Sequence, residues 1–90
     1  MIEIIKVLKI KKLGRFRLYL HFSDETEGEW DFSHVIAEKG SMVEPLRNPK
    51  YFARVFLQIG VLTWPNGFDL DSIALHDEMM AAGALRRTAA

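Results

Sequence analysis

Ninety residues, of which 49% are hydrophobic and 27% charged, suit one small globular domain and exclude wholesale disorder. The formal net charge is zero and the chain has no cysteine, which excludes disulfides, thiolate metal sites and cysteine nucleophiles. The missing cysteines and the charges that interrupt the apolar start of the chain favour a cytoplasmic protein with no signal segment and no membrane span.

The charges are unevenly distributed along the chain. Residues 1–22 carry six Lys or Arg against one Glu, whereas residues 23–45 carry seven Asp or Glu against one Lys. Such a division indicates either a nucleic-acid patch or two neighbouring strands that neutralise each other. We favour the second interpretation, because the elements predicted for these residues form a hairpin.

The first third of the chain predicts strands. Ile2–Ile10 is rich in Ile and Val, and Gly14 marks a turn. Arg15–Phe22 then alternates, with one apolar face and one polar face; the apolar face is Phe16, Leu18, Leu20 and Phe22. We therefore expect a strand with one solvent-exposed face and one buried face.

A hairpin is expected next. Ser23–Gly28 is a polar turn, and Glu29–Phe32 resumes the alternation with Trp30 and Phe32 facing inward. A hairpin centred on this turn places Leu20 opposite Trp30 and Leu18 opposite Phe32, with Glu29 and Asp31 on the outer face.

The middle of the chain predicts short helical turns. Ser33 is expected to cap a helix through Glu38 that Gly40 ends. Residues 41–46 form an irregular connector, and Asn48 caps a helical turn through Phe52 in which Pro49 takes the first position.

The last third predicts a second hairpin and a helix. Arg54–Ile59 and Val61–Trp64 pair across a tight turn at Gly60. A Pro-Asn-Gly turn at residues 65–67 leads to Asp71, which caps a helix over residues 72–82 that Gly83 stops. Residues 84–90 are expected to be a frayed tail.

Together these elements predict the α+β class. We expect a single small, mainly antiparallel sheet, with a short helix or turns between strands and one C-terminal helix packed on it. The predicted domain is residues 1–83, and a domain of this size could bury further apolar area as a homodimer.

Four strings in the sequence resemble a small bacterial family, the domain-of-unknown-function family two-four-four-two. The resemblance runs in register from Val7 to His76. The strings are Leu20-His21-Phe22-Ser23-Asp24, Gly28-Glu29-Trp30-Asp31-Phe32-Ser33, Glu44-Pro45-Leu46-Arg47-Asn48-Pro49 and Trp64-Pro65-Asn66-Gly67-Phe68-Asp69-Leu70. The chain departs from the family at Glu25, where an Asp-Gly turn is usual, so the first hairpin loop is expected to be longer. It also departs at Ser72 and His76.

The resemblance implies no known reaction. Members are short cytoplasmic bacterial proteins, and many are encoded beside another small protein in what look like toxin–antitoxin pairs. The resemblance therefore implies an antitoxin-like partner of a small neighbouring protein. The alternative that it leaves open is a nucleic-acid-binding or transcription-regulatory accessory domain.

Six residues are the candidates for binding a partner: Trp64, Asn66, Asp69, His76, Met79 and Met80. A tryptophan beside a rigid turn is a good anchor in an interface. The competing structural interpretation is that Trp64 fills the core, the Pro-Asn-Gly string sets the turn, and Asp69 bonds local backbone N–H groups. The methionines and His76 share an apolar helix stripe with Ile73, which packs on the sheet or meets a partner.

Other polar groups predict no catalytic, metal or cofactor site. The acidic residues 24–31 lie on a turn and a wet strand face, and the three histidines, His21, His34 and His76, have no metal-ligand spacing. No phosphate loop or nucleophile elbow occurs. We expect a non-enzymatic module without cofactors that binds a protein partner or itself, with nucleic acid through the basic first strands as the less favoured alternative.

Overall fold

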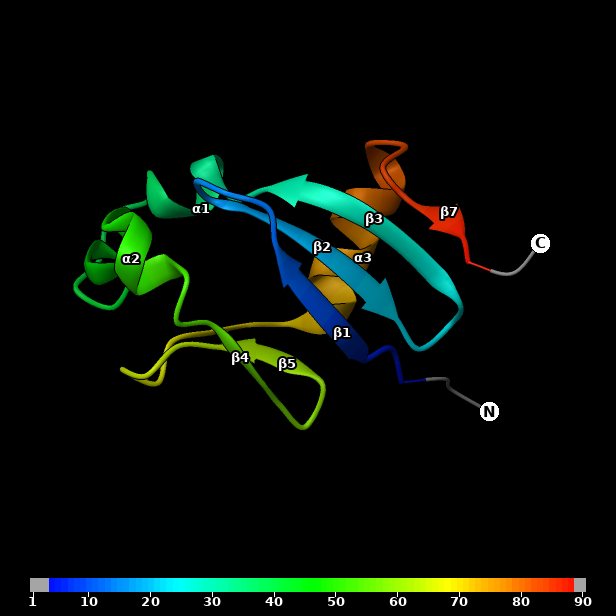
Figure 1. Cartoon of the computed structure of the whole chain (residues 1–90), viewed down its shortest axis with the longest axis horizontal. Helices are drawn as coiled ribbons and strands as arrows, with labels where there is room; N and C mark the ends of the chain where they lie inside the picture. Colours follow the sequence, from blue (N-terminus) through cyan, green and yellow to red (C-terminus); the bar gives the residue numbers. More distant parts are fainter. Residues whose placement is uncertain (1–3, 89–90) are drawn as a thin grey trace.

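The chain folds as an α+β protein with antiparallel strands, as predicted, but it has two sheets rather than one (Figure 1). The computed structural model describes residues 4–88. One sheet has the strand order β1-β2-β3-β7 and the other the order β4-β5-β6. The strands are β1 (Val7–Lys12), β2 (Arg17–Phe22), β3 (Thr26–Asp31), β4 (Phe56–Gln58), β5 (Val61–Thr63), β6 (Asp69–Leu70) and β7 (Arg86–Arg87).

The second sheet forms because the chain turns back on itself twice between residues 56 and 70. β4 pairs with β5 across a tight turn, as predicted, but the turn contains Ile59 as well as Gly60, whereas the prediction placed Ile59 in the strand. The Pro-Asn-Gly turn then returns the chain, and its ends are tied by the Trp64 N–H, which donates to the Phe68 carbonyl at 2.9 Å. Strand β6, which the sequence pattern did not predict, therefore adds to β5.

The helices lie at one end and behind the larger sheet. Short turns α1 (Ser33–Ile36), a 3-10 helix (Glu44–Arg47) and α2 (Pro49–Phe52) follow one another along the chain, and α3 (Ser72–Ala81) runs behind β2 and β3 in Figure 1. The Asn48 cap of α2 and the Asp71 cap of α3 are confirmed. The predicted Ser33 cap of α1 is wrong, because Ser33 is the first helical residue and its N–H donates to the carboxylate of Asp31 at 2.8 Å.

Strand β1 is the free edge of the four-stranded sheet and begins later than predicted. It starts at Val7, whose N–H donates to the carbonyl of Gly60 at 2.9 Å, and the register shifts between Val7 and Lys9, so Leu8 is the extra residue of a bulge. Residues 1–3, part of the predicted strand, lie outside the described residues.

The β2–β3 hairpin has the predicted faces but a register displaced by two residues. Leu18 lies opposite Trp30 and Leu20 opposite Gly28, where the prediction paired Leu20 with Trp30. The loop is shorter than predicted, because the N–H of Glu25 donates to Phe22 at 3.2 Å and β3 begins at Thr26. A displacement of two residues leaves each side chain on its predicted face.

The core lies between the inner face of the four-stranded sheet, the three-stranded sheet and α3. Leu18, Leu20 and Phe22 of β2 are fully buried, and one hydrophobic cluster joins them to Leu62 of β5 and Met79 of α3. The buried stripe of α3 is Ser72, Leu75, His76 and Met79. The predicted stripe is thus rotated, and Ile73 and Met80 are exposed.

Residues 86–88 are bonded to the β2–β3 hairpin, which corrects the prediction of a frayed tail. β7 pairs with β3 through Arg87 opposite Thr26 and Arg86 opposite Glu27. The predicted C-terminal stop at Gly83 has the positive φ of 71° typical of a helix end, and it turns the chain back toward β3. Residues 89–90 lie outside the described residues.

Candidate functional site

Trp64 serves the core in this structure. Its side chain is buried against Phe52 and Phe68, at ring-centroid distances of 5.6 Å and 5.8 Å. Its indole Nε1–H donates to the carbonyl oxygen of Phe52 at 3.0 Å, which ties β5 to α2. Binding of a partner by Trp64 stays a prediction, but the side chain offers no exposed surface in this conformation.

Asn66 holds the turn after Trp64 in place through three hydrogen bonds. Its side-chain Nδ2 donates to the carbonyl of Met42, its own N–H donates to the hydroxyl of Tyr51, and its Oδ1 accepts from the N–H of Phe68 at 3.1 Å. Asp69 is exposed in β6, and among residues 4–88 its carboxylate has no hydrogen-bond partner. The expected bonds from Asp69 to local backbone N–H groups are therefore not formed.

The candidates on α3 divide between the core and the surface. Met79 is fully buried, whereas Met80 is 54% exposed. His76 is buried, and its Nε2 lies 2.7 Å from the Oδ2 of Asp24 in the β2–β3 turn. Sequence reasoning missed this pair because 52 residues separate its members.

Asp24 is held as a carboxylate by its neighbours. Partial burial raises the pKa of Asp24, but hydrogen bonds from the Thr26 hydroxyl and from His76 outweigh this, so the net pKa lies below its ordinary value. The pair joins α3 to the hairpin loop. The ring of His76 also packs edge to face against the ring of Phe22, at a centroid distance of 5.1 Å, so the pair is part of the core packing.

The carboxylates of Glu27 and Glu29 in β3 form ion pairs with β7, whereas the sequence led us to expect that the basic strands would neutralise them. Arg86 reaches Glu27 and Glu29, each at 3.1 Å. The Tyr19 hydroxyl donates to Glu27 at 2.6 Å, which holds the pKa of that carboxyl below its ordinary value and raises the pKa of Tyr19. The bonds to Glu29 and Glu27 also raise the pKa of Arg86.

The basic residues of β1 and β2 are left without this neutralisation. Within residues 4–88, the ion pairs that form do not involve any Lys or Arg between positions 6 and 17. Lys11 lies over the ring of Tyr19 and Arg15 over that of Phe16, at 5.6 Å and 5.7 Å from the ring centroids. This end of the sheet therefore carries net positive charge.

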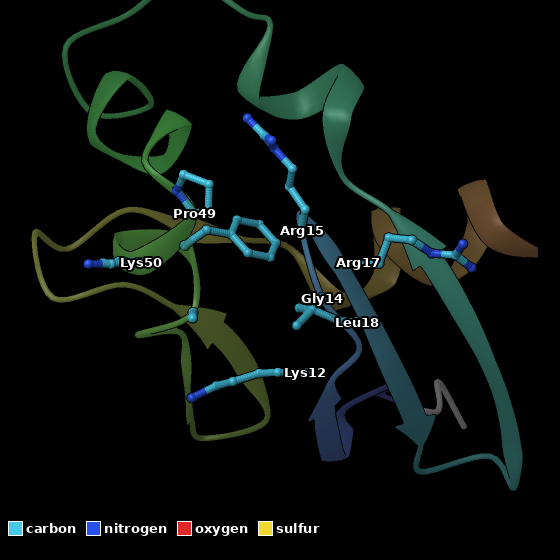
Figure 2. A pocket seen from close by; sticks show the side chains of 9 residues that line it. Lys12, Gly14, Arg15, Arg17, Leu18, Pro49 and Lys50 are labelled. Atoms are coloured by element: carbon cyan, nitrogen blue, oxygen red, sulfur yellow. The ribbon is translucent and has the colours of Figure 1, made fainter.

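A pocket of about 280 Å³ opens at the end of this basic region (Figure 2). The β1–β2 turn forms one side and α2 the other. Its lining contains four cations, with apolar groups between them. The lining residues are Lys12, Gly14, Arg15, Arg17, Leu18, Pro49, Lys50, Phe52 and Ala53. We call this the basic pocket.

The family that the four strings resemble also matches most of the chain. Residues 7–79 match the model of a family described as "Protein of unknown function (DUF2442)". The chain belongs to this family. No curated protein and no solved structure matches the chain.

The DUF2442 match extends from the start of β1 to Met79 in α3. It thus includes the Trp64 turn, the basic pocket and the Asp24–His76 pair, whereas β7 lies outside it. Within the described part of this DUF2442 chain, no helix is long and apolar enough to cross a membrane, and no group of three His, Asp or Glu side chains could hold a metal ion.

Large apolar side chains are exposed on two neighbouring elements of the DUF2442 fold. Ile4 and Leu8, before and in β1, are 65% and 57% exposed. Phe56 of β4 and Ile59 of the β4–β5 turn are 43% and 82% exposed. The Val7–Gly60 hydrogen bond holds the two elements together, and we call these four residues the apolar edge.

Proposed function

We propose that the chain is a non-enzymatic protein-interaction module, the antitoxin-like partner of a small protein encoded beside it. The resemblance of the sequence to proteins with such gene neighbours supports the kind of partner. The absence of cysteine supports a cytoplasmic setting. The conformation of one exposed residue in the apolar edge, Ile59, carries the proposal.

Isoleucine is an unfavourable residue type for the backbone conformation that Ile59 adopts. The two residues between the paired Gln58 and Val61 both have positive φ, 51° at Ile59 and 76° at Gly60. Such two-residue turns favour Asn, Asp or Gly, because a β-branched side chain is strained in the left-handed region. At 82% exposure, Ile59 gains little packing in return.

Gly60, in the same turn, is needed for a different reason: the chain at Lys6 comes too close to leave room for a side chain. A Cβ at Gly60 would lie 2.6 Å from the Cβ of Lys6, so the turn packs closely on the chain that leads into β1. This contact fixes the turn and holds Ile59 outward beside β1. A strained, exposed apolar residue in a fixed turn is expected where it makes contacts with a partner.

The apolar edge suits a protein partner better than a nucleic acid or a small substrate. Covering four large apolar side chains gains free energy through the hydrophobic effect, which phosphate groups do not supply. Such an edge can form the centre of a protein interface with the nearby lysines at its rim. We propose a different protein as the occupant because the antitoxin-like resemblance implies a pair of unlike chains.

Co-expression with the neighbouring gene product tests the proposal. We expect a complex that survives size-exclusion chromatography and that Ile59→Asn weakens. The same substitution should stabilise the isolated chain by roughly 1 kcal/mol, because Asn adopts the left-handed conformation more easily. The exposed Ile73→Asn on α3 is the matched control and should leave the complex unchanged.

Opposite effects of Ile59→Asn on stability and on binding would distinguish a functional residue from a structural one. A chain that elutes alone with every neighbouring product would contradict the proposal. So would a complex that Ile59→Asn leaves at full strength.

The basic region supports the second candidate, nucleic-acid binding. Within residues 4–88, no Lys or Arg of this region forms an ion pair with β3, which removes one argument against this function. Affinity for an oligonucleotide should then fall steeply as salt concentration rises, because phosphate contacts release counterions. Affinity that is independent of salt would rule this function out.

A further inference from the structure

The basic pocket has cations around its opening that lack carboxylate partners. Among the described residues, no carboxylate lies within ion-pair distance of Lys12, Arg15, Arg17 or Lys50. Asp31 lies opposite Arg17 in the register, but its carboxylate accepts from the N–H and hydroxyl of Ser33. The charge of Arg17 helps to lower the pKa of Asp31, so Lys12, Arg15 and Lys50 are the cations available to an external anion.

The inside of the basic pocket is apolar. Leu18 and Phe52 form its floor, and both belong to the hydrophobic core. Ala53 adds a methyl group, and Pro49 adds a ring without a backbone N–H. The edges of a nucleotide base would lose their hydrogen bonds to water here, so the interior favours an apolar side chain.

The cationic groups point in different directions. In Figure 2 the side chain of Arg15 extends upward and that of Arg17 to the right, whereas those of Lys12 and Lys50 both extend to the left. A single compact anion could not reach all of them. Negative charges spaced along an extended chain could.

We propose that the basic pocket binds a short acidic segment of the partner protein. One apolar side chain of that segment enters between Leu18 and Phe52, and flanking carboxylates meet Lys12, Arg15 and Lys50. This inference rests on the proposed function, because it takes the partner to be a protein. It adds the chemistry of the segment that is recognised.

Fluorescence anisotropy with designed peptides tests the inference. The probe is a labelled nine-residue peptide of alternating Glu and Asp with Phe at its centre, and its control has Gly in place of Phe. The wild-type chain should bind the Phe peptide about tenfold to a hundredfold more tightly than the Gly peptide, the size of effect expected for burying one apolar side chain.

Two charge-reversal pairs separate the pocket from general surface charge. Lys12→Glu with Arg15→Glu should weaken binding of the Phe peptide about tenfold or more. Lys9→Glu with Lys11→Glu makes the same change in net charge on the outer face and should weaken it about twofold or less. All four residues are exposed, so the fold should survive, and circular dichroism checks this.

A pocket-filling variant tests the apolar part separately. Ala53→Met extends a flexible side chain from the pocket wall, and the two peptides should then bind equally well. Failure of the wild-type chain to bind the Phe peptide would overturn the inference. Equal weakening by the two charge-reversal pairs would also overturn it, as would tighter binding of a single-stranded oligonucleotide of equal charge.

The complex with the neighbouring protein separates the two proposals. If that complex forms and both charge-reversal pairs leave it unchanged, the pocket inference fails and the proposed function stands. If no complex forms, the proposed function fails, and the peptide titrations decide whether the pocket still recognises an acidic segment.

Discussion

Replacing Gly28 with Ala should open the contact between β3 and the chain that leads into β7. Gly28 lies opposite Leu20 and is buried. A Cβ there would lie 2.1 Å from the carbonyl oxygen of Ala84 and 3.4 Å from the Cε of Met79. Methionine can move, but the Ala84 oxygen belongs to the backbone, so relief requires the two segments to separate.

We expect Gly28→Ala to reduce the free energy of unfolding by about 1–3 kcal/mol, the range for overpacked sites. The upper part of that range applies, because the contact is far shorter than an ordinary van der Waals distance. In a chain of this size, each kcal/mol lowers the melting temperature by about 4–8 °C. Urea denaturation followed by circular dichroism measures the difference.

A truncated chain that ends at Gly83 identifies the cause. Truncation removes Ala84 and β7, so the overlap disappears and Gly28→Ala should become neutral or stabilise by about 0.4–1 kcal/mol, through the smaller entropy of the unfolded chain. The double-mutant cycle then gives the energy of the contact. The reasoning is refuted if Gly28→Ala costs the same in both chains, or costs nothing in the full chain.

Three further substitutions test the packing, a helix cap and an ion pair. Trp64→Ala should destabilise by about 3–5 kcal/mol in urea denaturation, because it leaves a cavity and removes the indole hydrogen bond to the Phe52 carbonyl, which then keeps only the bond from the Val55 N–H; Trp64→Phe should cost less. Asp71→Ala should cost about 0.5–2 kcal/mol and reduce the helical circular dichroism signal, since Asp71 caps α3. The folded-state pKa of Asp24 lies below its ordinary value, so the stability that Asp24 contributes is present above the unfolded pKa and is lost as pH falls through the folded pKa. Unfolding measured from pH 7 to pH 3 should therefore show a steeper acid loss for the wild type than for Asp24→Asn, and equal slopes would contradict the lowered pKa that Thr26 and His76 give to Asp24.

Local patterns predicted most of the elements, because short-range physics decides them. The alternation of β2, the Asn48 and Asp71 caps and the turn at Gly60 all depend on residues within a few positions of one another. The hairpin register was wrong by two residues, because a side chain decided the loop length. The Asp24 carboxylate accepts from the N–H and hydroxyl of Thr26, so the strand resumes there.

Contacts between distant parts of the chain could not be predicted. Strand β6 has two residues and β7 has two, too few to show alternation. Arg86 pairs with Glu29 and Glu27 of β3, which lie 57 and 59 residues earlier in the chain. Counting charges over the first half of the chain therefore assigned these carboxylates the wrong partners.

The candidate site was predicted from residue type, and residue type does not reveal burial. Trp64 and Met79 are types that often bind partners, but the rotated stripe of α3 and the turn after β5 place them inside. The exposed apolar edge gave a weaker signal. Ile59 before Gly60 could have been noticed, since Asn or Asp is usual there.

The pairing of β7 with β3 also has a consequence for the order of folding. Strands β1, β2 and β3 form a local meander that can assemble early, because its loops are short. The outer edge of β3 cannot be closed until Arg86 and Arg87 arrive, about 60 residues further along the chain. During synthesis or refolding, the backbone groups of Thr26 and Glu27 therefore face water, open to pairing with another chain, until the last strand docks.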